Sequence, residues 1–148
     1  MCIQAYGPLC NCGAKGCLEA CVSSWALIRD ANAIARKKPD SPIASLPSLT
    51  PEDLAVLAAQ GDEDAAALWE KAGTMLGVGI ANIMNLLNPE RIILAGGLAK
   101  AGDLLLKPAE QTWRNQAFDR AHETTSVRMG TLGEWAGVRG AVQPLLKP

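Results

Sequence analysis

The chain has 148 residues, 49% of them apolar, and its 14 basic and 15 acidic side chains give a formal charge of -1. This length favours one domain over two complete lobes, and the near-neutral charge excludes the broad basic surface of a nucleic-acid binder. The N-terminus lacks the pattern of a signal peptide, and no apolar run reaches the roughly eighteen residues that span a bilayer. We therefore expect a cytoplasmic protein with no membrane partner and no direct nucleic-acid contact.

Four of the five cysteines, Cys10, Cys12, Cys17 and Cys21, fall within a short segment near the N-terminus. Clustered thiols without other signs of secretion indicate a metal site rather than a disulfide scaffold. Two glycines between them let the backbone turn sharply, and thiolate ligands favour zinc over harder ions. The segment 10–19 therefore predicts a zinc loop. The alternative interpretation is a group of buried thiols in a tight turn.

A closed structural zinc site has four ligands, whereas this loop firmly supplies three, Cys10, Cys12 and Cys17. Cys21 lies four residues after Cys17, so on a helix the two thiols would share a face. Cys21 is then either the fourth ligand or a small core residue. Cys2, in the preceding extended segment, is another candidate for the fourth ligand, and the sequence leaves both open.

Mainly helical segments follow the cysteine loop. Apolar residues at helical spacing predict a first helix over 18–35, and a loop rich in proline and serine follows at 39–49. Thr50 has the position of an N-cap for a second helix, which extends to Gly61. An acidic first turn and a long apolar stripe predict a third helix over 62–87.

Gly73, Gly77 and Gly79 lie inside the predicted long helix, where each costs roughly 1 kcal/mol relative to alanine. We interpret them as positions of close packing against another backbone rather than as a flexible hinge. The four tryptophans are assigned to the core or to interfaces. His122 stands alone in a polar stretch and is assigned to the surface.

The segment 91–95 is a short continuous apolar run, which predicts a strand buried on both faces, as in a parallel sheet. Gly96 and Gly97 follow it, and a helix is expected over 102–118, so 91–118 forms a strand–Gly-Gly–helix unit. A loop without side chains lets a ligand approach the backbone, and the following helix N-terminus favours anions. A plain tight turn is the alternative explanation of the two glycines.

A second strand is predicted at 126–129 and a last helix at 133–146. The order strand, helix, strand, helix is typical of a crossover unit in an α/β protein.

The cysteine loop resembles the signature of a known family. Its pattern Cys-x-Cys-Gly-x-x-Gly-Cys-x-Glu, over residues 10–19, is similar to the zinc motif of the ROK (repressor, open reading frame, kinase) family. The resemblance continues, in the family's order and spacing, through residues 87–97, 102–106 and 132–141. It therefore covers essentially the whole chain.

The resemblance implies an α/β fold. It is the C-terminal portion of an actin-like ATPase (ribonuclease H-like) lobe, helix-rich, with a truncated parallel sheet and a zinc loop. Residues 1–148 would form this C-terminal lobe, with the zinc loop at 10–19 and the strand–Gly-Gly–helix unit at 91–118, and the N-terminal lobe would be absent. A truncated sheet should leave the strand at 91–95 with an unpaired edge. Family members commonly dimerise through this lobe, so we expect a homodimer.

The resemblance also implies site residues. Zinc would be held by Cys10, Cys12 and Cys17. Glu19 would accept hydrogen bonds from the hydroxyls of a sugar, because a carboxylate only accepts and a metal-braced turn fixes its direction. The alternative is that Glu19 only caps the following helix. Gly96 and Gly97 would lie against ATP in the kinases of the family.

Several functional parts of the family are not found in this sequence. The family's histidine ligand stands ten positions before the first cysteine, which is one place before Met1. The Asp-x-Gly phosphate loop and the catalytic aspartate are also missing, and the acidic pairs at 52–53 and 63–64 are explained by helix starts. Phosphoryl transfer requires both phosphates and nucleophile in position, so we expect this chain alone not to be a competent kinase.

Three hypotheses about function follow. The chain is the C-terminal lobe of a kinase for a glucose-like or N-acetylated amino sugar, the sugar-sensing lobe of a transcriptional repressor, or a free-standing zinc-stabilised module. The segment 134–137 is slightly more similar to the kinases, and we therefore favour the first hypothesis.

Overall fold

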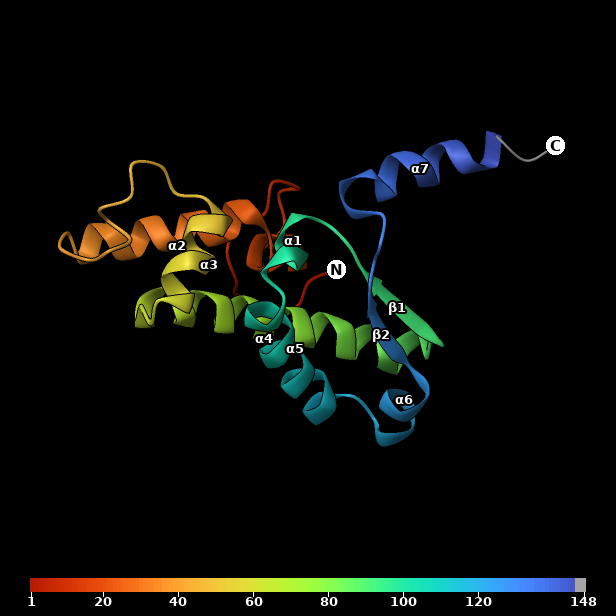
Figure 1. The fold of residues 1–148 in the computed structure, drawn as a ribbon. Coiled ribbons are helices and arrows are strands. Elements are labelled where there is room, and N and C mark those ends of the chain that lie inside the picture. Colours follow the sequence, from red (N-terminus) through yellow and green to blue (C-terminus); the bar gives the residue numbers. More distant parts are fainter. Residues whose placement is uncertain (146–148) are drawn as a thin grey trace.

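The protein is an elongated, mainly helical molecule, and the computed structural model describes residues 1–145 (Figure 1). The helices are α1 (Leu18–Cys21), α2 (Ser24–Lys37), α3 (Pro51–Ala59), α4 (Glu63–Leu87), α5 (Asp103–Gln116), α6 (Asp119–Thr124) and α7 (Ala136–Val142). The strands are β1 (Arg91–Leu94) and β2 (Ser126–Met129), and short 3-10 turns lie at Gly97–Ala101, Gly133–Trp135 and Gln143–Leu145. None of the described helices is long and apolar enough to cross a membrane.

Local signals set both ends of α4, the longest helix. At its start, the Asp62 carboxylate accepts a hydrogen bond from the Ala65 N–H at 2.8 Å, as an N-cap does. At its end, Asn88 adopts a left-handed conformation with φ 42°, and its N–H donates to the Met84 carbonyl at 2.9 Å. The predicted long helix is confirmed.

The glycines of α4 mark its closest contacts with other helices. A Cβ atom at Gly77 would lie 2.5 Å from the Ala109 carbonyl oxygen of α5, and one at Gly73 would lie 2.5 Å from the Leu105 carbonyl oxygen. A Cβ atom at Gly79 would lie 3.0 Å from the Leu18 side chain of α1. The prediction of close packing against another backbone is confirmed at Gly73 and Gly77, whereas Gly79 packs against a side chain.

The first predicted helix, 18–35, is wrong as a single element, because it is broken between Cys21 and Ser24. Ser23 between them is an N-cap, and its hydroxyl accepts a hydrogen bond from the Ala26 N–H at 3.2 Å. This cap starts a new helix in a new direction, so α1 and α2 are separate.

The two strands form a parallel pair in which Ile92 lies opposite Val127. The inward side chains Ile92 and Leu94 pack on a cluster of buried residues from α4, α5 and α6. Ile93 on the other face is 61% exposed. The prediction that this strand is buried on both faces is therefore wrong, since none of the described elements covers its outer face.

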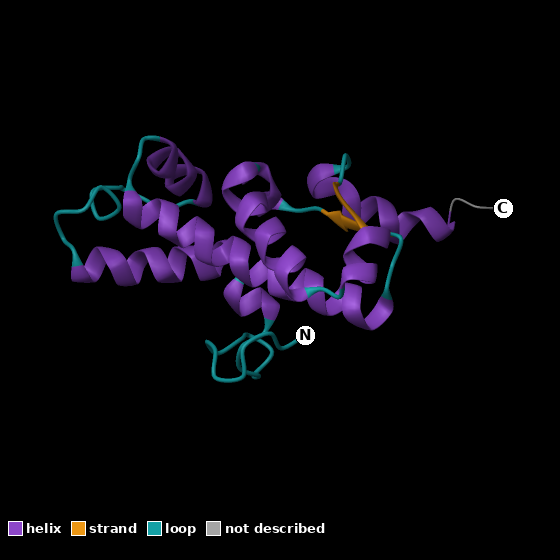
Figure 2. Ribbon diagram, turned by 90° about the horizontal axis from the view of Figure 1, so that it is seen from below, coloured by secondary structure: helices purple, strands orange, loops and turns teal. Residues whose placement is uncertain are grey.

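Two clusters of buried side chains lie along α4. The first joins α2, α3 and the N-terminal half of α4 around Trp69 and Leu54, and the second joins α4, α5 and α6 under the sheet around Ile80 and Met84. Helix α7 extends away from both clusters (Figures 1 and 2), and none of its residues is buried. The predicted last helix thus begins as a 3-10 turn and continues as α7, and its end at Leu146 lies outside the described residues.

Candidate metal centre and neighbouring loops

The cysteine loop folds back against the N-terminal segment and is held there by backbone hydrogen bonds. The Gly16 N–H donates to the Pro8 carbonyl at 2.8 Å, while the Gly16 carbonyl accepts from the Ile3 N–H at 2.8 Å. Gly16 has φ 69°, and a Cβ atom there would collide with the Gln4 carbonyl oxygen. Glycine is therefore required at this turn, which brings the N-terminal segment against the loop.

The loop places three thiols in one group. The sulfur atoms of Cys10, Cys12 and Cys17 all lie within 4.8 Å of one another, and those of Cys12 and Cys17 are 3.6 Å apart. In a tetrahedral zinc site with Zn–S bonds of about 2.3 Å, neighbouring sulfurs are about 3.8 Å apart. The spacing of the thiols and their chemistry therefore fit a zinc ion, as the sequence predicts.

Hydrogen bonds within this group shift the pKa values of two thiols in opposite directions. A backbone hydrogen bond at Ala14, aided by hydrogen bonds from the Cys10 and Cys17 thiols, lowers the pKa of Cys12 below its usual 9.0. The hydrogen bond with Cys12 raises the pKa of Cys17 to about 11. Both thiols would bind a metal ion as thiolates.

The two other candidate ligands lie outside the group of three. The Cys21 thiol donates toward the side-chain oxygen of Gln4 at 3.8 Å, and the Cys2 thiol donates to the Lys15 carbonyl at 3.4 Å. Over residues 1–145, the structure thus brings together only the three cysteines of the predicted loop. The direction of each thiol depends on contacts between segments, which the spacing of cysteines in the sequence does not show.

Glu19 lies in the first turn of α1, two residues after the thiol of Cys17. Its side chain is exposed and forms no hydrogen bond or ion pair within the described part of the chain. The interpretation of Glu19 as a cap is not supported, because Cys17 is the N-cap of α1 and Ser23 that of α2. The carboxylate is therefore available to a ligand.

Helix α1 is held in place by a residue that the sequence did not indicate. The Arg29 guanidinium donates to the Ala20 carbonyl at 3.0 Å, and Ala20 is fully buried. Arg29 also packs over the Trp25 ring, 5.3 Å from its centroid. The hydrogen bond to Ala20 joins α2 to the short helix that carries Glu19, and the contact with Trp25 lies within α2.

Gly96 and Gly97 follow β1 after Ala95 and line an open cavity of about 290 Å³. A Cβ atom on either glycine would meet nothing within 4 Å, so packing does not require glycine here. Gly96 has φ 114°, which only glycine adopts readily. Ser23 and Ser24, at the junction of α1 and α2, line the same cavity. The glycine loop and the segment after Glu19 therefore share one hollow.

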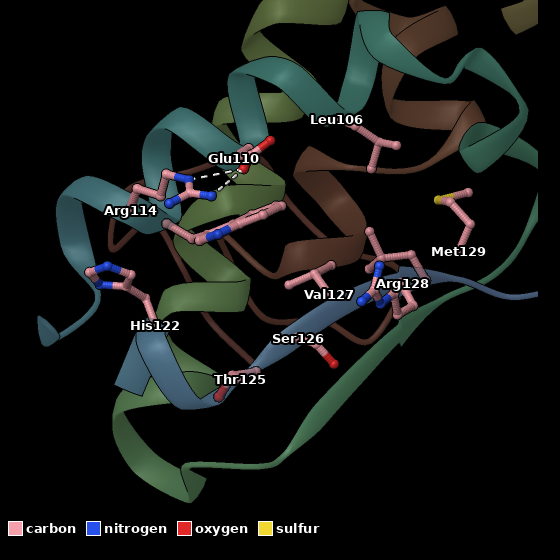
Figure 3. A pocket seen from close by; sticks show the side chains of 11 residues that line it. Leu106, Glu110, Arg114, His122, Thr125, Ser126, Val127, Arg128 and Met129 are labelled. Carbon is pink, nitrogen blue, oxygen red and sulfur yellow. Dashed lines mark hydrogen bonds and ion pairs between the residues drawn. The ribbon is translucent and has the colours of Figure 1, made fainter. Parts of the chain in front are cut away.

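A separate cavity of about 320 Å³ lies between α5, α6 and β2 (Figure 3). Arg114 and Glu110 form an ion pair of 2.7 Å along one side. His122 lines the cavity and its Nδ1 atom is buried without a hydrogen-bond partner among the described residues. The half-buried ring of His122 therefore lies beside a cavity, which the prediction of a surface histidine did not include. Three consecutive elements, together with Leu94 of β1, form this cavity, and its shape depends on how they pack, which no sequence motif indicated.

Comparisons with known proteins agree on one family. Over residues 1–147 the chain matches the model of the ROK family. It is 38% identical over 142 residues to a glucokinase of Halalkalibacterium halodurans, covering 93% of this chain and 43% of that protein. It is 29% identical over 139 residues to the DNA-binding transcriptional repressor Mlc of Escherichia coli, covering 94% of this chain and 34% of the repressor.

A solved structure agrees with the sequence matches. The crystal structure of a ROK family glucokinase from Streptomyces griseus, in complex with glucose and AMPPNP, superposes with a TM-score of 0.77 at 26% identity. The aligned region is 97% of this chain and 49% of that one, so the chain spans less than half the length of these relatives. The predicted class, a helix-rich part of an actin-like ATPase fold with a small parallel sheet, is confirmed. Since the match extends over nearly all of its residues, the chain belongs to the ROK family.

Proposed function

We propose that this chain is the zinc-bearing C-terminal part of a ROK sugar kinase that transfers phosphate from ATP to a hexose or an N-acetylated amino sugar. The observation that carries the proposal is the pairing of a three-thiol loop with the exposed, unpartnered carboxylate of Glu19 directly after it. A loop that needs reduced thiols also suits the reducing environment of the cytoplasm.

In this proposal the metal has a structural role. Cys10, Cys12 and Cys17 hold zinc as thiolates, and the ion cross-links a loop that otherwise depends on a few backbone hydrogen bonds. Because Cys17 is the N-cap of α1, fixing its sulfur also fixes the start of the helix that bears Glu19. The carboxylate then accepts hydrogen bonds from sugar hydroxyls in one direction only, which favours one orientation of the sugar.

The nucleotide would bind against Gly96 and Gly97. The absence of side chains there leaves the backbone open, and the cavity beside it extends to the junction of α1 and α2. ATP bound at this loop would therefore approach the segment that follows Glu19. Side chains larger than hydrogen at Gly96 would also strain the backbone, because of its positive φ.

The chain by itself is expected to lack kinase activity, because the acidic pairs at 52–53 and 63–64 begin helices and do not replace the family's catalytic aspartate. Asp53 accepts a hydrogen bond of 2.6 Å from the Thr50 hydroxyl, and Asp64 pairs with Lys38 at 2.7 Å. Both carboxylates already have a hydrogen-bond or ion-pair partner in the first turn of a helix. The base and the second phosphate-binding loop would come from the part of the relatives that this chain does not cover.

The second candidate function is the sugar-sensing part of a ROK repressor. The 29% identity to the repressor Mlc supports it, whereas the 38% identity to a glucokinase favours the kinase. The two candidates share the zinc loop and Glu19 and differ in ATP turnover.

A chimera tests the proposed kinase function. In it, this chain replaces the matching part of the Halalkalibacterium halodurans glucokinase, and coupled assays measure sugar-dependent ATP turnover. We expect turnover with glucose or N-acetylglucosamine and one zinc per chain by elemental analysis. Glu19→Gln should retain zinc but lower kcat/KM about 10- to 100-fold, the loss expected for one charged hydrogen bond.

Glu123→Gln, an exposed carboxylate on α6, is the matched control and should behave as the unmodified chimera. A folded, zinc-loaded chimera without turnover on any hexose would contradict the kinase proposal. Sugar binding without turnover would support the sensor instead.

A further inference from the structure

We propose that Cys12 and Cys17 are a modification site: when the loop holds no metal, a peroxide joins them in a reversible disulfide. The same loop then has two exclusive states, metal-bound and oxidised. The disulfide rests only on the placement of these two thiols, whereas the exclusion of metal also rests on the zinc site proposed above.

The arrangement of the five thiols selects this pair. The sulfurs of Cys12 and Cys17 are 3.6 Å apart, so small side-chain rotations and a modest loop movement bring them to bonding distance. Cys12 is exposed and accessible to an oxidant, whereas Cys10 is 4% exposed. The Cys2 and Cys21 thiols are directed to other partners, at Lys15 and Gln4.

The loop between the two cysteines is able to adapt. Cys12 and the residues 13–15 are all exposed, and a Cβ atom at Gly13 would meet nothing within 4 Å. A shift at Gly13 meets no steric obstacle, and the backbone hydrogen bonds that must yield are those of the Gly13 N–H to the Cys10 carbonyl and of the Cys10 N–H to the Ala14 carbonyl. The tightly fitted Gly16 anchors the far end of the loop, so Cys12 can move toward Cys17 while the segment that precedes α1 stays in place.

The reaction is balanced with hydrogen peroxide as the oxidant. The Cys12 sulfur attacks one peroxide oxygen, the O–O bond breaks, and one water leaves, which gives a sulfenic acid at Cys12. The Cys17 sulfur then attacks the Cys12 sulfur, and the S–O bond breaks. The hydroxyl group of the sulfenic acid leaves with the Cys17 thiol proton as a second water. Two thiols lose two electrons, and peroxide gains them.

Oxidation removes two of the three metal ligands at once. Cys10 alone then remains in the group, and one thiolate is insufficient for a zinc site. Since Cys17 is the N-cap of α1, the oxidised loop also changes the constraint on the helix that bears Glu19. Peroxide would thereby release zinc and loosen the carboxylate, and a thiol reductant would reverse both effects.

The test uses the purified chain after removal of metal with a chelator. Trypsin cleaves after Lys15, between the two cysteines, so only a disulfide keeps the peptides 1–15 and 16–29 together. After brief treatment with hydrogen peroxide, we expect non-reducing mass spectrometry to find these peptides joined and dithiothreitol to separate them. Cys12→Ser and Cys17→Ser should each abolish the joined species, whereas Cys2→Ser and Cys21→Ser should retain it.

Cys10→Ser separates the disulfide from the metal. This variant keeps both thiols of the pair and should form the disulfide, but zinc added before the peroxide should protect only the unmodified chain. Joined peptides that persist in Cys12→Ser, or oxidation of Cys12 to a sulfinic acid without any joined peptides, would overturn the proposal. A disulfide that forms equally fast with and without zinc would leave the pair valid and contradict the metal site.

Discussion

Asp30 is the residue that joins three helices through its carboxylate. One of its oxygens accepts from Arg29 at 2.7 Å, and the other pairs with Lys71 of α4 at 2.7 Å. Arg29 in turn donates to the Ala20 carbonyl at the end of α1. Partial burial opposes ionisation of Asp30, but the hydrogen bonds from Lys71 and Arg29 outweigh it and lower its pKa below 3.8.

This pKa has a consequence for stability at acid pH. A carboxylate whose pKa is lower in the folded state stabilises the fold above its unfolded pKa, and the contribution is lost as pH falls through the folded value. Asp30 should therefore contribute fully near neutral pH and lose its contribution below about pH 3.8. Asp30→Asn should lower the free energy of unfolding by about 1 kcal/mol at pH 7 and should reduce its dependence on acid pH.

Urea unfolding followed by tryptophan fluorescence between pH 7 and pH 3 measures the effect. Asp119→Asn, an exposed carboxylate at the start of α6, should retain the pH dependence of the unmodified chain. If the free energy of unfolding of the Asp30 variant changed with pH as steeply as that of the unmodified chain, solvent would fully screen the ion pairs of Asp30.

At the scale of elements, the packing of α4 on α5 dominates the fold. The two helices approach so closely that carbonyl oxygens of α5 lie where the side chains of Gly73 and Gly77 would otherwise be. The low helix propensity of glycine is thus offset by contacts that larger residues would prevent.

Substitution of one glycine in each of two helices separates these effects. Gly77→Ala forces the added methyl group against the Ala109 carbonyl and should destabilise the fold by about 1–3 kcal/mol. Gly137→Ala in α7 meets nothing within 4 Å and should stabilise its helix by about 0.5–1 kcal/mol. Urea unfolding measures both, and a similar stability change in the two variants would contradict the role of Gly77 in packing.

At the scale of the whole molecule, apolar side chains remain exposed at one end. Trp135 is 67% exposed and Val138 is 57% exposed on the projecting end of the chain, and Ile93 is 61% exposed on the outer face of the sheet (Figure 1). Within residues 1–145, β1 also pairs along only one edge. Unpaired edges and contiguous apolar surface favour association with another protein.

We therefore expect the isolated chain to self-associate at micromolar concentration, consistent with the predicted homodimer. Trp135→Glu should shift the species measured by light scattering toward the monomer, because it places a charge on the exposed apolar surface. Lys37→Glu, at the opposite end of the molecule in α2, should leave the distribution unchanged. A monomeric unmodified chain would contradict this expectation.

The sequence alone predicted several helix ends and the grouping of the three thiols, because both depend on interactions between residues close together in the chain. Thr50 caps its helix as predicted, and the long helix begins at the predicted acidic segment, where Asp62 is the N-cap, and ends at Leu87. The three thiols of the cysteine loop lie together because glycine turns within a few residues bring them there. Caps, turns and periodic apolar residues act over a few positions, so their effects are visible in a single sequence.

Features that depend on distant segments were decided only by the tertiary structure. The Cys2 and Cys21 thiols are directed away from the group of three cysteines by hydrogen bonds to Lys15 and Gln4. Ile93 is exposed because no described element covers the outer face of β1, although its apolar run alone indicated burial. Burial and side-chain direction are set by what packs against a residue from elsewhere in the chain, and one-dimensional spacing does not contain that information.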